Sequence, residues 1–141
     1  MTLVIDASAA LYLLASERGI EPFATFDLVS PALLWSEVTS VLNEMRWRGE
    51  LSPALAQTAF DRLLASPIDR RADDRLYRDA REVARTLGWA RTYHAEYVAL
   101  ARALEVDILS RDERLRRGAT GLTTVVSPDE LVPPKHSTAP E

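Results

Sequence analysis

Four acidic residues of this sequence stand where a metal-dependent site would need them: Asp6, Glu37, Glu96 and Asp112. Asp6 follows the continuous apolar run 3–5, which is typical of a strand buried on both faces. In an open parallel sheet, ligands bind in the crevice outside the carboxyl ends of the strands. Asp6 is therefore a candidate ligand. Its alternative role is to cap the helix that follows.

The other three acids fall at comparable places. Asp112 follows a strand predicted at residues 106–110. Glu37 lies on the second turn of a predicted helix and flanks its apolar side, whereas Glu96 lies in the first turn of another helix. Each acid also has an ordinary structural role open to it, because Glu37 can pair with an arginine and Asp112 can cap a short helix. A partly buried carboxylate without a partner is costly.

A divalent cation between converging carboxylates would offset that cost. The chain has no Cys and only two His, so oxygen atoms dominate the available ligands. Oxygen ligands favour Mg²⁺ or Mn²⁺. Such an ion lowers the pKa of its bound water and stabilises negative charge on a phosphate. The chemistry that these residues indicate is metal-dependent hydrolysis of a phosphodiester bond.

Strands and helices are predicted to alternate along the whole chain. Strands are expected near residues 3–5, 27–29, 68–72, 106–110 and 123–126. Helices are expected near residues 8–17, 30–48, 53–65, 74–87, 93–104 and 113–117, with a further turn from Pro128. Ser30-Pro31 and Ser52-Pro53 are both predicted to start helices, with Ser as N-cap and Pro in the first turn. This alternation predicts an α/β fold, a three-layer α/β/α sandwich with a mainly parallel central sheet.

The composition suits one globular domain of 141 residues, of which 47% are apolar. We expect residues 1–132 to form that domain and residues 133–141, which are Pro, Ser, Thr and charge, to be disordered. The sequence predicts no membrane span and no signal peptide, and we expect a cytoplasmic protein. The net charge of −4 excludes a global basic field for nucleic-acid binding.

Four segments, taken in order, resemble the motifs of PIN-domain ribonucleases, and specifically the VapC toxins of prokaryotic toxin–antitoxin pairs. The opening segment 4–9 resembles their first motif, and Ser30-Pro31 followed by 36–38 resembles the second. The segment 93–101 resembles the third and 108–115 the fourth. Each motif is weak alone, but together they span about residues 3–131.

The resemblance implies a three-layer fold with an acidic pocket that binds Mg²⁺ or Mn²⁺. It also implies endonucleolytic cleavage of RNA, a homodimer, and neutralisation by a cognate VapB-type antitoxin whose tail reaches the pocket. Asp6, Glu37 and Asp112 match acids of the family. Ser8 and Ser110 match small hydroxyl residues that support the pocket through hydrogen bonds.

The third motif departs from the family pattern, because His94 stands where these toxins usually have Asp. Glu96 restores the charge two residues later, although two residues on a helix are separated by about 200°. We take Glu96 as the fourth catalytic and metal-binding residue and His94 as a supporting one. The alternatives are that His94 ligates the metal through a neutral nitrogen, or that neither residue does.

The sequence is compatible with two functions from different classes. One is a toxin that cleaves RNA with the help of a metal. The other is a catalytically impaired PIN-like module that binds RNA or a partner. A phosphorylated flavodoxin-like or receiver domain is more distant, because it needs a Lys after a late strand and this chain has no Lys before Lys135. Residues 51–64 are a candidate surface for the dimer or antitoxin contact.

Overall fold

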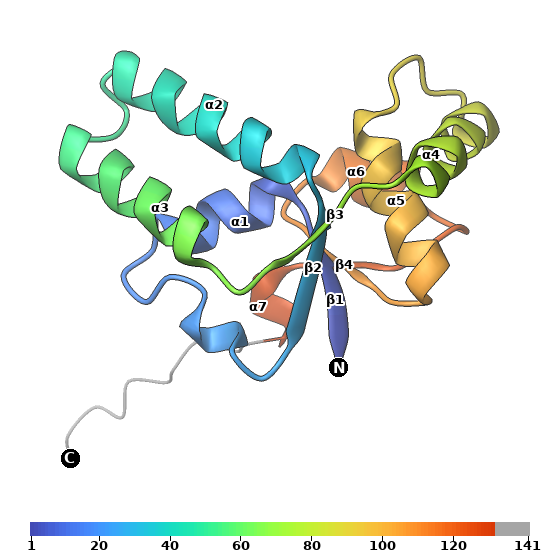
Figure 1. The fold of residues 1–141 in the computed structure, drawn as a ribbon, viewed down its shortest axis with the longest axis horizontal. Helices are drawn as coiled ribbons and strands as arrows, with labels where there is room; N and C mark the ends of the chain where they lie inside the picture. The colour runs from blue at the N-terminus through green and yellow to red at the C-terminus, as the bar shows by residue number, and fades with distance from the viewer. Residues whose placement is uncertain (132–141) are drawn as a thin grey trace.

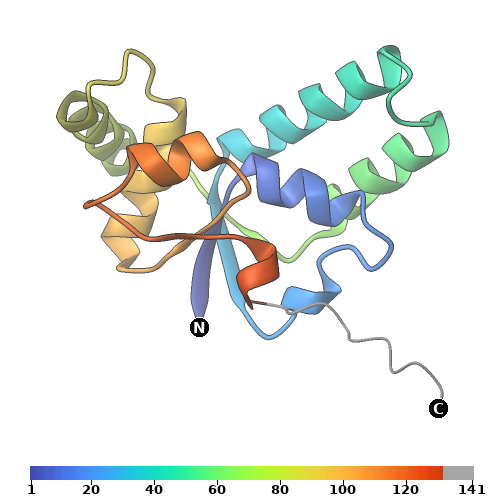
Figure 2. The ribbon, with the colours of Figure 1, turned by 180° about the vertical axis from the view of Figure 1, so that it is seen from behind.

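The computed structural model describes residues 1–131 and contains a five-stranded sheet with helices on both faces (Figures 1 and 2). The strands are β1 (Thr2–Ile5), β2 (Asp27–Pro31), β3 (Asp69–Arg71), β4 (Ile108–Leu109) and β5 (Val125–Val126). Their order in the sheet is β3-β2-β1-β4-β5, and every pair is parallel. The predicted α/β architecture with a parallel central sheet is confirmed.

Helices cover both faces of the sheet, in two groups that are consecutive along the chain (Figure 1). The first group is α1 (Ala7–Leu14), α2 (Leu33–Trp47) and α3 (Pro53–Ala65), and the second is α4 (Asp74–Leu87), α5 (Tyr93–Leu104) and α6 (Glu113–Gly118). The short 3-10 helix η1 (Glu21–Phe23) precedes β2, and α7 (Pro128–Leu131) ends the described chain. No helix within residues 1–131 is long and apolar enough to cross a membrane.

The order of the strands explains why the two groups of helices lie on opposite faces. The chain runs outward from β1 to β2 and β3, and then returns to place β4 on the other side of β1. Right-handed crossovers in opposite directions put their helices on opposite faces. The reversal falls between β1 and β4, where the backbone N–H of Asp6 donates to the carbonyl of Leu109 at 3.1 Å. Ligands bind at such a switch point in open α/β sheets.

The central strand and helix α5 form the middle of the core. Leu3, Val4 and Ile5 are each at most 1% exposed, which confirms that β1 is buried on both faces. Helix α5 contacts β1, β2 and β4. It carries small buried residues such as Ala95 and Ala101, which allow its backbone to approach the sheet closely. This packing brings the first turn of α5 to the edge of the sheet where β1 ends.

The prediction that Ser30-Pro31 starts a helix is wrong. Both residues belong to β2, and α2 begins at Leu33 after Ala32. The hydroxyl of Ser30 donates to the carbonyl of Ile5 at 2.9 Å, so it joins two strands instead of capping a helix. Pro31 is the last residue of the strand, and the N–H of the next residue, Ala32, donates to the carbonyl of Arg71 at 2.8 Å. The Ser-Pro signal is local, whereas the pairing that overrides it is a tertiary contact.

Helix α1 ends at Leu14, three residues before the predicted end at Glu17. The guanidinium of Arg62 on α3 donates to the carbonyls of Leu14 (2.9 Å), Ser16 (2.6 Å) and Glu17 (3.1 Å). Gly19 follows with φ +60°, a conformation that favours glycine. The cation therefore replaces the next helical turn as the partner of these carbonyls.

We expect Arg62→Ala to lower the free energy of unfolding by about 2 kcal/mol, because three carbonyls lose a charged donor at a helix end. Arg62→Lys should recover only part of the loss, since an ammonium group lacks the planar fork. Urea denaturation measures the free energy of unfolding of both variants. Arg78→Ala, an exposed site on α4, is the matched control, and an equal loss there would contradict the capping role.

The predicted ends of other helices are confirmed. Ser52 caps α3 by accepting the N–H of Leu55 at 3.1 Å, and Gly49 and Gly88 follow α2 and α4 with positive φ. The last two strands are shorter than predicted, since β4 and β5 have two residues each. The tail predicted to be disordered, 133–141, lies outside the described residues.

Candidate active site

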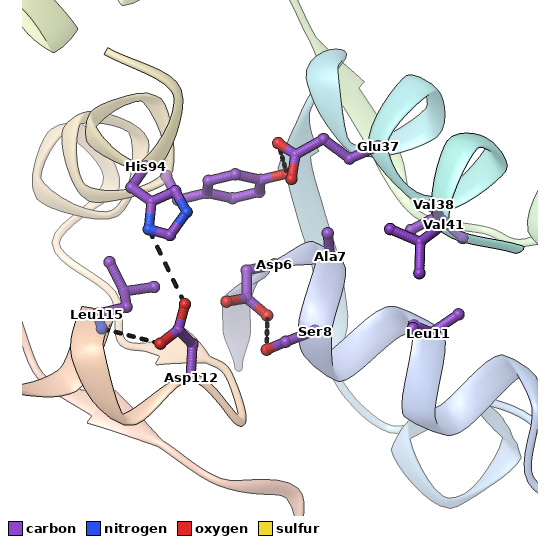
Figure 3. A pocket seen from close by; sticks show the side chains of 11 residues that line it. Asp6, Ala7, Ser8, Leu11, Glu37, Val38, Val41, His94, Asp112 and Leu115 are labelled. Carbon is purple, nitrogen blue, oxygen red and sulfur yellow. Dashed lines mark hydrogen bonds and ion pairs between the residues drawn. The ribbon is translucent and has the colours of Figure 1, made fainter. Parts of the chain in front are cut away.

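A pocket of about 270 Å³ opens at the carboxyl ends of β1 and β4 (Figure 3). Side chains from both helical layers line it, so it lies between the two groups of helices. The lining residues are Asp6, Ala7, Ser8, Leu11, Glu37, Val38, Val41, His94, Tyr97, Asp112 and Leu115. The structure thus brings three of the four predicted acids, Ser8 and His94 to one cavity.

Asp6 both caps a helix and lines the pocket. Its Oδ1 accepts the N–H of Ala9 at 2.9 Å, which is the N-cap contact of α1, and also the hydroxyl of Ser8 at 2.7 Å. Its Oδ2 accepts the hydroxyl of Ser110. The side chain is held at 5% exposure. The capping role considered for Asp6 is therefore real, and it orients the carboxylate without removing it from the cavity.

Ser8 and Ser110 join the loop after β4 to the start of α1. Ser8 Oγ accepts the N–H of Arg111 at 2.9 Å, and Ser110 Oγ accepts the N–H of Asp112 at 3.0 Å. The two hydroxyl oxygens are 3.2 Å apart, and each donates its one proton to a different oxygen of Asp6. Both side chains support Asp6 and the loop that carries Asp112.

Asp112 is the N-cap of α6. Its Oδ1 accepts the N–H groups of Arg114 (2.9 Å) and Leu115 (3.3 Å). Its Oδ2 faces the pocket and lies 4.0 Å from Nδ1 of His94 (Figure 3). One oxygen therefore fixes the orientation of the side chain, and the other is free to act in the cavity.

Glu37 enters the pocket from α2 and has a partner that the sequence analysis missed. The hydroxyl of Tyr97 on α5 donates to Glu37 Oε1 at 3.1 Å, and both residues line the cavity. Tyr97 is 2% exposed. A tyrosine on the apolar side of a helix needs a partner for its hydroxyl, and this requirement was the available signal.

We expect Tyr97→Phe to raise the pKa of Glu37, because the hydrogen bond from Tyr97 lowers it. Tyr97→Phe keeps the buried ring, so the loss of stability should be about 1 kcal/mol. NMR titration of the Glu37 carboxyl carbon measures the pKa in both proteins. Tyr77→Phe on α4 removes a hydroxyl far from the pocket and should leave the titration unchanged. An unaltered Glu37 titration in Tyr97→Phe would show that the hydrogen bond is not formed in solution.

The carboxylates of the pocket are electrostatically unfavourable as they stand. Burial raises the pKa of Asp6 and of Glu37, and the charge of Asp112 raises the pKa of Asp6 further. The hydrogen bonds to Asp6 from Ser110, Ala9 and Ser8 act in the opposite direction. No Arg or Lys belongs to the described lining of the cavity. The pocket therefore has the charge and the oxygen atoms that attract a cation.

Glu96 does not share the cavity of the other three acids, although it lies close to Glu37. It is buried at 9% exposure and is not among the described residues that line the pocket. Burial and the charge of Glu37 raise its pKa. His94, two residues earlier on α5, has a half-exposed side chain and does line the cavity. The rotation between the two positions puts them on different sides of the helix.

No group of three or more His, Asp or Glu side chains within residues 1–131 is gathered closely enough to hold a metal ion. Asp6, Glu37 and Asp112 nevertheless fit a hard cation by their chemistry, because each presents carboxylate oxygen to the same cavity. Mg²⁺ usually keeps several waters and binds only one or two carboxylates directly. A cation here would need retained waters or inward movement of these side chains.

The family model of the PIN domain matches residues 3–120. The structure is similar to the crystal structure of PAE2754 from Pyrobaculum aerophilum, with a TM-score of 0.68. The two share 20% sequence identity over 94% of this chain and 93% of that chain, a likeness that concerns the fold alone. No curated protein sequence matches the chain. The matched family model covers most of the sequence, and the chain belongs to the PIN-domain family.

Proposed function

We propose that this PIN domain is a metal-dependent endoribonuclease and the toxin of a VapC-type type II toxin–antitoxin system. PIN domains are generally nucleases, and the family match covers the residues that line the pocket. The observation that carries the proposal is the cavity at the switch point, where Asp6, Glu37 and Asp112 meet without a compensating Arg or Lys among the described lining. An acidic cavity of this kind suits a cation and a phosphodiester substrate.

Asp6, Glu37 and Asp112 are the residues that would hold Mg²⁺ or Mn²⁺. A bound ion of this type supplies an activated water and stabilises charge on the phosphate. The chain contributes the orientation of the carboxylates. Ser8 and Ser110 fix Asp6, and Tyr97 fixes Glu37.

Glu96 and His94 are both retained as candidates for the remaining position. Glu96 is buried near Glu37, and the charge of Glu37 raises its pKa, a repulsion that a cation between the two carboxylates would relieve. The location of His94 in the cavity, near Asp112, supports the alternative. Glu96→Gln and His94→Ala, assayed side by side for RNA cleavage, distinguish them. We expect the variant of the true ligand to lose at least about tenfold in rate and the other to lose little.

The test of the proposed function is incubation of the protein with RNA in Mg²⁺, in Mn²⁺ and in EDTA. We expect internal cleavage in either metal and none in EDTA. Unchanged cleavage in EDTA would overturn the metal dependence. RNA binding without cleavage at any metal concentration would favour the alternative, a catalytically impaired module that binds RNA or a partner.

The toxin role also requires partners, namely a VapB-type antitoxin and a second copy of the chain. Large apolar side chains at the end of α2 and on α3 support such contacts, since Trp47 is 81% exposed, Leu64 61% and Leu55 37%. Light scattering after gel filtration should give the mass of a dimer. Leu64→Glu should reduce that mass to a monomer, and an unchanged dimer would exclude this surface.

A further inference from the structure

A second and larger cavity, of about 550 Å³, adjoins the acidic pocket. The two share Glu37, His94 and Leu115 in their linings, so they lie side by side. The second cavity lies between the connection from α4 to α5 and helix α6, and we call it the Trp89 cavity. Its lining is Glu37, Gly88, Trp89, Ala90, Arg91, Tyr93, His94, Arg114 and Leu115. The volume is in the range of sites that bind small ligands, about 300–1,000 Å³.

Trp89 has contacts at both its backbone and its ring. Its backbone N–H donates to the carbonyl of Ala84 at 2.8 Å, and its indole packs against Gly118 and His94. A Cβ at Gly118 would lie 2.7 Å from Cζ2 of Trp89, so only glycine leaves room for the ring there. The ring of His94 meets the indole edge-on, with the centroids 6.4 Å apart. An aromatic surface that is already ordered binds a flat partner at a lower entropic cost.

The Trp89 cavity carries two arginines besides Glu37, whereas the acidic pocket has none in its described lining. Arg91 and Arg114 are exposed, and neither guanidinium forms an ion pair or hydrogen bond with another described residue. Tyr93, which is 54% exposed, adds a second aromatic side chain. Arginine forks match the geometry of phosphate groups, and aromatic faces stack on nucleobases. The acidic pocket has no arginine in its described lining, and the tyrosine there, Tyr97, is buried.

We propose that the Trp89 cavity binds an unpaired base of the RNA next to the phosphate that is cleaved. The base stacks on Trp89 or Tyr93, and Arg91 and Arg114 contact the flanking phosphates. This inference rests on the proposed function, because it places the scissile phosphate in the adjoining acidic pocket. It also implies that the protein selects single-stranded RNA, since a paired base cannot enter the cavity.

Binding is measured by fluorescence anisotropy with a labelled single-stranded RNA of about ten nucleotides, in an Asp6→Asn background that cannot cleave it. We expect Tyr93→Ala and Arg91→Ala each to weaken binding about tenfold, the magnitude of one lost stacking or phosphate contact. Tyr77→Ala and Arg81→Ala are the matched controls. They remove the same residue types from exposed sites on α4 and should leave Kd within about twofold.

Two further comparisons address stacking directly. RNA should quench the fluorescence of Trp89, and the quenching should disappear in Trp89→Phe while Trp35 and Trp47 remain. A series of RNAs with one abasic site moved along the strand should show one position at which the missing base weakens binding. That loss should be absent in Tyr93→Ala or Trp89→Ala, whichever removes the ring that stacks on the base. Circular dichroism verifies that each variant is folded.

The outcomes separate this inference from the proposed function. If the wild-type protein cleaves RNA but Tyr93→Ala and Arg91→Ala bind it as the controls do, the Trp89 cavity is not a base site and the nuclease proposal stands. If the variants and the abasic series behave as expected but no cleavage occurs, the base site is supported and the protein is a module that binds RNA without cleaving it. If the variants weaken only the binding of a protein partner, the cavity is a protein-docking surface and the inference is overturned.

Discussion

Replacing Asp6 with asparagine should lower the rate of RNA cleavage by at least about 1,000-fold and leave the protein folded. Stabilisation of transition-state charge by a metal ion contributes several kcal/mol, and each 1.36 kcal/mol corresponds to tenfold in rate. Asp6 is the most deeply buried of the three acids that line the pocket, and its carboxylate is positioned by Ser8, Ala9 and Ser110. The loss should therefore exceed that of any other single substitution in the pocket.

The fold should survive because the asparagine amide keeps an acceptor for the N–H of Ala9 and for the hydroxyl of Ser8. Only the hydrogen bond with Ser110 must change direction, because the amide N–H of the asparagine would donate to the Ser110 hydroxyl oxygen. The substitution also removes a buried negative charge, which offsets part of the stability lost with the hydrogen bond. We expect the free energy of unfolding to change by less than about 2 kcal/mol, measured by urea denaturation.

Two controls bracket this result. Asp74→Asn changes an exposed acid outside the pocket and should retain full activity. Asp6→Ala removes the helix cap as well as the charge, so it should lose about 1 kcal/mol more stability than Asp6→Asn with no further loss of activity. Cleavage by Asp6→Asn at more than a tenth of the wild-type rate would exclude Asp6 from the chemistry.

Addition of Mg²⁺ or Mn²⁺ should stabilise the protein near neutral pH by about 2.7 kcal/mol when the free ion is at 100 times its Kd. The cation would bind the ionised carboxylates and relieve the repulsion among Asp6, Glu37 and Asp112. Differential scanning calorimetry in metal and in EDTA measures the shift in Tm. The shift is independent of cleavage, so it tests the metal site even if the enzyme is slow.

The pH dependence follows from the raised pKa values. Without metal, protonation of Asp6, Glu37 and Glu96 favours the folded state, because their pKa values are higher in the fold than the ordinary 3.8 for Asp6 and 4.5 for the two glutamates. This stabilisation is complete below those ordinary values and is lost as the pH rises through the raised pKa values. Stabilisation by a bound metal ion has the opposite pH dependence, because protons compete with the ion for the carboxylates. The stabilisation by Mg²⁺ should therefore fade on acidification.

The same carboxylate variants serve as controls for the calorimetry. Asp6→Asn and Glu37→Gln should lose most of the metal-induced shift, whereas Asp74→Asn should keep it. Identical Tm values in Mg²⁺ and in EDTA at neutral pH would mean that the cavity does not bind the ion in the free protein.

The order of strands and helices was predictable because the local patterns agree with the fold. The apolar run 3–5, the Ser52 cap and the glycines at 49 and 88 all appear where they were expected. Ser30-Pro31 misled because the same dipeptide suits a helix start and the end of a strand, and the hydrogen bond to Ile5 decides between them. Arg62 likewise ends α1 from a different helix, and no local pattern near residue 14 reveals it.

The positions of Asp6 and Asp112 at the ends of strands could be predicted, because a run of apolar residues followed by an acid is a local signal. Which side chains share the cavity depends on contacts between elements that are distant along the chain. It places His94 at the pocket and Glu96 away from its lining, and it gives Glu37 the partner Tyr97. It also joins the acidic pocket to the Trp89 cavity. These outcomes depend on the orientation of α5 about its own axis relative to the sheet. Packing across the core sets that orientation, and the spacing of residues along the chain does not.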